Sequence, residues 1–281
     1  MVSTTSFGIT NQQVTVVGLG GEGVLRTFGR VNQAAAVIHE ALDRGIKYFD
    51  SARVYSDSEV YYGSVWGDRK DVRLKIFQTS KSASRDKKGA LADLEQTLER
   101  LETDFLDLWQ IHDVRTEEEI EEIAGPGGAL EAFVEARLSG KVRYIGVTGH
   151  HDPEVLTRAV REWPVDSVMM PVNPVETLLG GFLTLTLPAA KEKGIAIIGM
   201  KILGGSHYLI SQLGITPESL IRYALSHDIT VAIVGCSTPG DARTLAEEGS
   251  IPKPMTEKEK TALLGKFEPY AERLAFYRGV I

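Results

Sequence analysis

Short apolar runs alternate with longer amphipathic stretches along almost the whole chain. Between residues 88 and 101, leucines recur at spacings of three and four, which predicts a helix with one buried face. The runs rich in β-branched and aromatic residues are too short for helices and predict strands. These strands are predicted at residues 14–17, 46–49, 74–80, 105–111, 142–147, 168–172, 195–198 and 229–234.

Helical patterns separate nearly all of these strands. They cover residues 34–42, 59–66, 88–101, 116–122, 129–138, 152–161, 188–193, 216–226, 241–248 and 257–277. Eight alternations of strand and helix indicate the α/β class and predict a closed (β/α)8 barrel, the TIM barrel. Such barrels of about 250 residues commonly form one domain, so residues 1–281 are predicted to be a single barrel domain.

A glycine cluster after the first strand offers a rival fold. Gly18, Gly20 and Gly23 match the G-x-G-x-x-G fingerprint of the open, dinucleotide-binding Rossmann sheet. That fingerprint requires an uninterrupted helix and an acidic strand end about 20 residues further on. Here Gly29 interrupts the helix, and the next strand ends at Asp50, 32 residues after Gly18. The barrel is therefore favoured.

Charge and cysteine content narrow the possible partners. The net charge of −7 argues against nonspecific binding to nucleic acid or to an anionic membrane. Cys236 is the only cysteine, which excludes an intrachain disulfide and fits a reducing cytoplasm. The start of the chain lacks a signal-peptide pattern, and no apolar run approaches 18 residues. We expect a cytoplasmic protein that acts on a small molecule; the sequence does not predict its oligomeric state.

Titratable residues follow three successive predicted strands. Asp50 ends the strand at 46–49, Lys81 follows the strand at 74–80, and His112 closes the strand at 105–111. Parallel strands bring these ends together, so the three side chains should share one pocket with Tyr55 on the loop after Asp50. A tyrosine with a pKa near 10 is a weak acid, but an adjacent Lys81 ammonium would lower its pKa. This group predicts acid–base chemistry.

The same stretch resembles the aldo-keto reductase family. The resemblance runs from about Val14 to Glu248 and rests on four motifs: Phe49-Asp50-Ser51-Ala52 with Tyr55, Thr79-Ser80-Lys81, Leu106-Asp107-Leu108 with Gln110-Ile111-His112, and the segment from Lys141 to Thr148. It implies a carbonyl reductase that uses NADPH, with Tyr55 as the proton donor. It also implies cofactor contacts at Gly20, Gly21, Asp50, Thr148, Asn173, Met200, Lys201, Leu203, Gly204, Gly235, Ser237, Thr238 and Arg243.

Several positions depart from the pattern of that family. Thr148-Gly149-His150 stands where many members have serine-asparagine, Val172 and Asn173 stand where a glutamine often holds the carboxamide, and Met200 replaces a stacking aromatic residue. The cation expected for the 2′-phosphate of NADP is absent from its usual place, with Arg243 nearby. NADP is the expected cofactor, and NAD stays open.

Other interpretations of the same residues remain. Asp50 and Lys81 alone could be a structural ion pair. The chain could bind a nicotinamide cofactor as a redox sensor with little turnover, or Lys81 could form a Schiff base in a lyase, although a neighbouring Asp50 opposes this. His150 and His151 suggest a metal, but no third ligand has convincing spacing, so no metal site is predicted.

Overall fold

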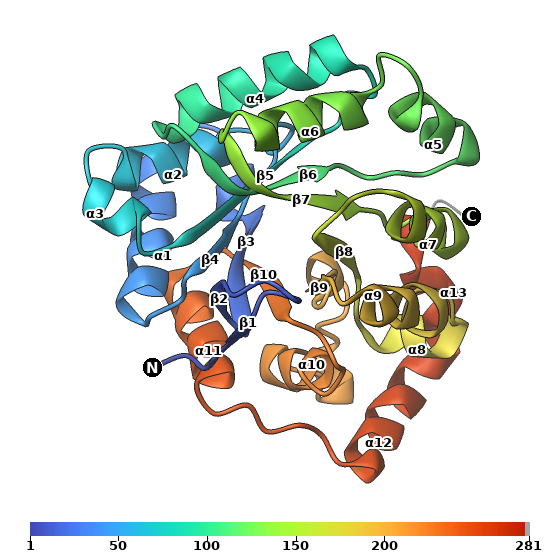
Figure 1. Cartoon of the computed structure of the whole chain (residues 1–281). Helices are drawn as coiled ribbons and strands as arrows, with labels where there is room; N and C mark the ends of the chain where they lie inside the picture. The colour runs from blue at the N-terminus through green and yellow to red at the C-terminus, as the bar shows by residue number, and fades with distance from the viewer. Residues whose placement is uncertain (279–281) are drawn as a thin grey trace.

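A computed structural model describes residues 1–278 and shows a closed barrel of eight parallel strands surrounded by helices (Figure 1). The strand order around the barrel is β10-β3-β4-β5-β6-β7-β8-β9. The predicted fold class is therefore confirmed. The barrel strands are β3 (Val17–Gly23), β4 (Tyr48–Asp50), β5 (Phe77–Ser82), β6 (Leu106–Ile111), β7 (Val142–Thr148), β8 (Ser167–Pro171), β9 (Ala196–Met200) and β10 (Val231–Cys236).

Helices cover the outside of the barrel and follow the predicted alternation. Most predicted helices are present with shifts of one or two residues at their ends, the uncertainty that is usual for helix boundaries. The helices are α1 (Val31–Asp43), α2 (Ser58–Trp66), α3 (Lys70–Arg73), α4 (Lys87–Leu101), α5 (Glu117–Ala124), α6 (Ala129–Leu138), α7 (Pro153–Glu162), α8 (Pro174–Leu179), α9 (Leu187–Lys193), α10 (Pro217–Ala224), α11 (Pro239–Ser250), α12 (Glu257–Phe267) and α13 (Ala271–Leu274).

The predicted first strand, at residues 14–17, was wrong. The apolar run is divided: β2 (Gln13–Thr15) pairs antiparallel with β1 (Thr4–Ser6), and the barrel strand β3 begins only at Val17 and contains the glycines. The hairpin places Phe7 against Phe77 and Tyr144 inside the barrel, with ring centroids 4.8 and 5.6 Å apart. The hairpin thus seals the end of the barrel opposite the C-terminal strand ends with apolar side chains.

Three other boundaries differ because of local breaks. The strand predicted from Leu74 starts at Phe77, since residues 74–76 form the turn that follows the short helix α3. An additional helix, α8, begins at Pro174 with Asn173 as its cap. The single helix predicted at 257–277 is divided into α12 and α13, with Pro269 in a 3-10 turn between them, because proline cannot continue an α-helix.

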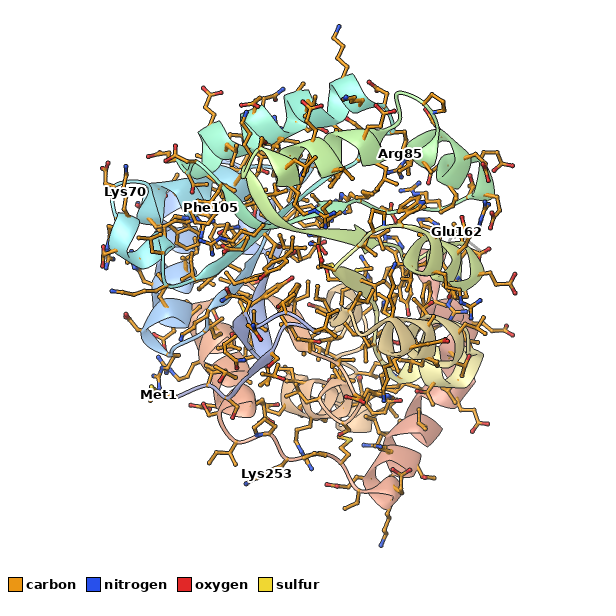
Figure 2. The ribbon with its side chains drawn as sticks, viewed as in Figure 1. Met1, Lys70, Arg85, Phe105, Glu162 and Lys253 are labelled. Carbon is orange, nitrogen blue, oxygen red and sulfur yellow. The ribbon has the colours of Figure 1, made fainter. Side chains whose placement is uncertain are left out.

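The buried apolar side chains form two clusters, a smaller one inside the barrel and a larger one between strands and helices. Figure 2 shows the side chains on the ribbon. Within the described residues, no helix is both long and apolar enough to cross a membrane. The Asp107 carboxylate of one family-like motif is buried, and it accepts hydrogen bonds from Arg73 at 2.8 Å and Arg143 at 2.7 Å. This part of the motif therefore joins β6 to its neighbours and takes no part in the pocket.

Candidate active site

A buried ion pair lies at the C-terminal ends of β4 and β5. Asp50 and Lys81 are each 1% exposed, and the Lys81 ammonium donates to Asp50 Oδ2 at 2.6 Å and to the Ser51 carbonyl oxygen at 2.7 Å. Thr79 Oγ1 donates to Asp50 Oδ1 at 2.7 Å, and Gln110 Nε2 does so at 3.4 Å. Side chains of β5 and β6 thus donate hydrogen bonds to both oxygens of the Asp50 carboxylate, because the parallel register places their strand ends beside that of β4.

Tyr55 and His112 complete the group that the sequence predicted. The Lys81 ammonium lies 4.7 Å from the centroid of the partly buried Tyr55 ring, and the His112 ring stands edge-on to Tyr55 at 5.6 Å. Arg26, on the turn after β3, lies over the same tyrosine ring at 4.9 Å. The four predicted side chains therefore do meet at one end of the barrel, with a second cation that the sequence analysis missed.

The electrostatics differ from expectation at Tyr55. Burial raises the pKa of Tyr55 well above its usual value, and the nearby Asp50 carboxylate raises it further. The expected net lowering of the pKa of Tyr55 was therefore wrong in direction, because burial outweighs the nearby positive charges. The Lys81 ammonium hydrogen-bonds Asp50 and lies over the tyrosine ring face. Burial also lowers the pKa of Lys81, while Asp50 opposes that shift. Tyr55 consequently keeps its proton through neutral pH.

His112 is an uncharged member of the group. Burial holds the pKa of His112 well below its usual value, and the charge of Lys81 adds to this effect. Its backbone N–H donates to the Ser82 carbonyl oxygen at 2.8 Å, whereas its buried Nδ1 has no hydrogen-bond partner among the described residues. The buried Nδ1 cannot reach a ligand, so a hydrogen bond from the neutral imidazole to a substrate oxygen would have to come from Nε2–H.

A pocket of about 300 Å³ opens beside this group. It is lined by Asp50 and Tyr55 and by nine residues predicted as cofactor contacts or their neighbours: Gly20, Gly21, Met200, Lys201, Ile202, Leu203, Gly204, Gly235 and Ser237. Six lining residues are glycines, so a ligand can approach the main chain closely. A Cβ on Gly21 would lie 2.6 Å from the Tyr55 ring, and Gly204 has a φ of +54°. Glycine at these two positions makes room for the tyrosine and shapes the loop after β9.

Four predicted cofactor residues do not line this pocket: Thr148, Asn173, Thr238 and Arg243. Thr148 Oγ1 accepts a hydrogen bond from the Asp113 N–H at 2.8 Å. The Asn173 side chain caps α8 and donates to the Lys201 carbonyl oxygen at 3.2 Å and the Tyr277 hydroxyl at 3.1 Å. Both side chains therefore serve the fold in this structure, and Asn173 has no amide group free for a carboxamide.

The N-terminus of α11 already holds a negative charge. Thr238 caps this helix, and the backbone N–H groups of Ser237 and Thr238 each donate to Asp241 Oδ2 at 2.9 Å. Arg243 is turned away from the pocket and donates to Glu40 on α1 at 3.0 Å. The sequence had predicted a phosphate at this helix end, where Asp241 now takes the N–H groups.

The pocket also has walls that the sequence analysis missed. Glu22, which pairs with Arg26 at 2.6 Å, and the side chains of Met169, Ile233 and Phe276 line it. His207 also lines the pocket, and its ring centroid lies 5.0 Å from that of Phe276. No local pattern could reveal Phe276, because the C-terminal segment brings it over the barrel from outside the strand–helix repeat.

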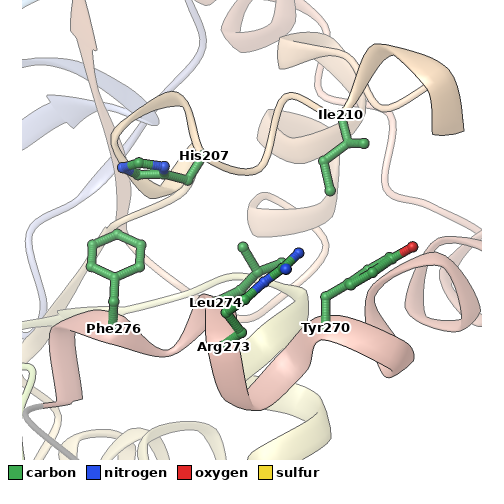
Figure 3. A pocket seen from close by; sticks show the side chains of 6 residues that line it. All are labelled: His207, Ile210, Tyr270, Arg273, Leu274 and Phe276. Carbon is green, nitrogen blue, oxygen red and sulfur yellow. The ribbon is translucent and has the colours of Figure 1, made fainter. Parts of the chain in front are cut away.

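A more open hollow of about 660 Å³ adjoins the pocket through His207 and Phe276. In Figure 3, His207 and Ile210 face Tyr270, Arg273, Leu274 and Phe276 across this hollow. It lies apart from Asp50 and Lys81, so the smaller pocket is the one associated with the chemistry. Phe276 lines the smaller pocket, and residues 279–281 lie outside the described residues.

The fold and this site define a (β/α)8-barrel protein with a cluster of titratable side chains at the C-terminal ends of its strands. A family model described as "Aldo/keto reductase family" matches residues 17–213, and the chain belongs to that family. The aldo-keto reductase AKR11C1 from Bacillus halodurans (holo form) has a similar fold, with a TM-score of 0.77, 19% identity, and coverage of 94% of this chain and 96% of that chain.

Curated relatives support the same family. "Aldo-keto reductase yakc [NADP(+)]" of Schizosaccharomyces pombe is 29% identical over 70% of this chain and 60% of its own length. "L-galactose dehydrogenase" of Arabidopsis thaliana is 26% identical over 69% of this chain and 63% of its own. The chain thus matches less than two thirds of the length of each of these relatives. Both relatives carry the names of oxidoreductases. Aldo-keto reductases reduce carbonyl compounds with NAD(P)H.

Proposed function

We propose that this chain is an NADP(H)-dependent reductase of aldehyde or ketone carbonyls, with Tyr55 as the general acid. The observation that carries the proposal is the position of Tyr55, which lines the glycine-rich pocket and lies against both Lys81 and His112. A structural ion pair would explain Asp50 and Lys81 but not the tyrosine and histidine beside them. Four titratable groups converge beside the pocket, and two of them, Asp50 and Tyr55, line it, which favours catalysis.

The pocket residues fit a nicotinamide dinucleotide. Backbone groups at Gly20, Gly21 and Gly235 line the pocket on the barrel side, and the loop from Lys201 to Gly205 lines the other. Lys201 would supply charge to a phosphate. Burial lowers the pKa of Lys201, and Glu22 opposes this shift. When bound, the cofactor supplies a hydride to the carbonyl carbon.

The side chains would manage the proton. Tyr55 keeps its proton at neutral pH and would donate it to the carbonyl oxygen, because the alkoxide that develops there is a stronger base than a phenolate. The Lys81 ammonium beside the ring would stabilise the phenolate that remains, and Asp50 would hold the ammonium in place. Neutral His112 would orient the carbonyl oxygen. Lys81 donates to both Asp50 and the Ser51 carbonyl oxygen, which disfavours a Schiff-base lyase.

The 2′-phosphate of NADP would require a local rearrangement. Arg243 pairs with Glu40 on the surface, and such exposed pairs contribute only about 0–1 kcal/mol, so a phosphate could take the arginine. Glu40 would keep Arg44, its other partner at 2.9 Å. Asp241 would oppose the phosphate because its carboxylate occupies the helix end. We therefore expect a modest preference for NADPH over NADH.

The decisive experiment replaces Tyr55 by phenylalanine. Tyr55→Phe should bind NADPH like the unaltered protein in a fluorescence titration but lose roughly 10²–10⁴-fold in kcat with aldehyde substrates, the usual contribution of general acid catalysis. Tyr62→Phe removes a buried hydroxyl that is bonded to the Leu19 carbonyl oxygen at 3.4 Å and does not line the pocket. This variant is the matched control and should keep its activity.

Two outcomes would contradict the proposal. Near-normal reduction by Tyr55→Phe at saturating NADPH would show that another group supplies the proton. An unaltered protein that binds NADPH tightly but turns over no aldehyde or ketone would instead support the redox-sensor interpretation. One observation favours this second candidate. The hydrogen bonds that the Asn173 side chain makes within the fold leave its amide group unable to bind the nicotinamide carboxamide.

A further inference from the structure

Asp113, His150 and His151 form a cluster outside the proposed proton-transfer group. Asp113 follows β6 and the two histidines follow β7, so the barrel register brings together residues that are distant in sequence. His150 Nε2 lies 3.1 Å and His151 Nε2 lies 3.7 Å from the same atom, Asp113 Oδ1. One ligand atom from each residue lies within 4.8 Å of the others. The third ligand that the sequence did not reveal is therefore Asp113.

The hydrogen bonds around the cluster leave these atoms free. His150 Nδ1 lies 2.8 Å from the Tyr277 carbonyl oxygen, which can only accept, so Nδ1 carries the proton and the neutral ring presents a lone pair at Nε2. Arg115 donates to Asp113 Oδ2 at 2.9 and 2.6 Å, whereas the buried Oδ1 accepts no hydrogen bond from the described residues. With a neutral His150 ring, a lone pair of nitrogen faces a lone pair of oxygen, which is unfavourable unless a second proton on the ring or a metal cation lies between them.

The backbone of Asp113 is held in an uncommon conformation that aims this carboxylate. Its φ is +57°, and its N–H and C=O are fixed by Thr148 Oγ1 at 2.8 Å and by Arg85 Nη2 at 2.8 Å. A strained residue that its surroundings hold in place is often functional. The His150 contact to a carbonyl oxygen is the arrangement that orients metal-binding histidines in proteins.

We propose that Asp113, His150 and His151 bind a divalent zinc ion. Zinc takes histidine nitrogen and carboxylate oxygen at about 2.0–2.2 Å, so two tetrahedral ligand atoms lie about 3.3 Å apart. The distances of 3.1 and 3.7 Å lie on either side of that value. The side chains are 14–23% exposed, which leaves a fourth position open to solvent. The ion would fasten the loops after β6 and β7 and, through His150, the segment that carries Tyr277.

A single His150–Asp113 ion pair is the competing explanation. It would need a doubly protonated His150, and it leaves the convergence of His151 on the same oxygen unexplained. His151 makes no hydrogen bond within the described residues, and its ring stacks on that of His150 with centroids 4.6 Å apart. Stacking alone does not direct its Nε2 to the Asp113 oxygen. The two explanations differ in one measurable property, which is the affinity of the unaltered chain for zinc.

The test uses the full chain after treatment with a chelator and dialysis. Titration calorimetry with Zn²⁺ should show one saturable site per chain, and Co²⁺ should give the intense visible absorption of four- or five-coordinate cobalt. His151→Ala and Asp113→Asn should each weaken zinc binding by at least about 100-fold, since even residues that only support metal ligands commonly account for 10–100-fold. Zinc should raise the melting temperature of the unaltered chain but not of these variants.

Two features keep the result interpretable. His151→Ala removes no hydrogen bond of the fold, and asparagine tolerates the positive φ of Asp113, so both variants should fold, as circular dichroism would confirm. His39→Ala, an exposed histidine on α1, is the control and should bind zinc like the unaltered chain. Absence of saturable zinc binding in the unaltered chain, or equal binding by folded His151→Ala and Asp113→Asn, would overturn the proposal.

Discussion

Replacing Lys81 by methionine should destabilise the chain through the charge that it leaves behind. Asp50 would stay 1% exposed with the Thr79 hydroxyl at 2.7 Å and the distant Gln110 amide at 3.4 Å as its hydrogen-bond donors. Two neutral donors do not replace an ammonium at 2.6 Å. Removing one partner of a buried ion pair typically costs about 3–5 kcal/mol, a large share of the 5–15 kcal/mol that holds most domains folded.

Urea unfolding monitored by circular dichroism would measure this loss. Lys75→Met is a matched control, because Lys75 pairs with Asp71 at 3.6 Å on the surface, where both side chains are more than two thirds exposed. That substitution should change the free energy of unfolding by only about 0–1 kcal/mol. The contrast between the two lysines isolates the effect of burial from that of removing an ammonium.

A double substitution tests whether the pair is the cause. Asp50→Asn together with Lys81→Met removes both charges, so its cost should be well below the sum of the two single costs. If the two costs simply add, or if Lys81→Met is no more destabilising than Lys75→Met, the uncompensated charge is not the source of the loss. Because Lys81→Met is expected to destabilise the fold, a loss of activity in that variant would not isolate the chemical step. Tyr55→Phe is therefore the cleaner test of catalysis.

Two other predictions concern the cofactor and pH. Arg243→Ala should lower the ratio of NADPH to NADH affinity by up to about fivefold, whereas Asp241→Asn should raise this ratio roughly 2–5-fold. Arg44→Ala is the control and should leave the ratio unchanged. Equilibrium binding measurements in which neither Arg243→Ala nor Asp241→Asn changes the ratio would contradict the prediction. Because the pKa of His112 lies below 6.5, acidification protonates the unfolded chain first and lowers stability below about pH 6.5. His112→Gln should lose less unfolding free energy than the unaltered chain between about pH 7 and pH 5.5, and equal losses would refute the sign.

The barrel and the convergence of the titratable side chains were predictable because both follow from strand ends. Apolar runs that stop at a charged residue identify where a parallel strand leaves the core, and the register then places Asp50 beside Thr79 and Lys81 beside Gln110. Tyr55 is close enough in sequence to follow Asp50 into the same pocket. The hairpin of β1 and β2 was not predictable, because nothing in the run Val14 to Val17 shows that one part pairs outside the barrel.

Side-chain partners that depend on distant elements could not be predicted either. Arg243 is directed by Glu40 on another helix, Asn173 by Tyr277 from the C-terminal segment, and the raised pKa of Tyr55 depends on how deeply the ring is buried. Asp113 lies 37 positions before His150, and only the pairing of β6 with β7 brings them together. Sequence periodicity gives no information on such contacts.

The pairing of β3 with β10 has a kinetic consequence. This seam joins the first barrel strand to the last, and Gly20 and Gly235, which are register partners, both line the glycine-rich pocket. Contacts between such remote segments form slowly during folding. A dinucleotide that binds across the seam can bind only a closed barrel, and it therefore adds its binding free energy to the stability of that state. A bound cofactor would therefore slow the opening of the barrel at the pairing of β3 with β10, where its first and last strands meet.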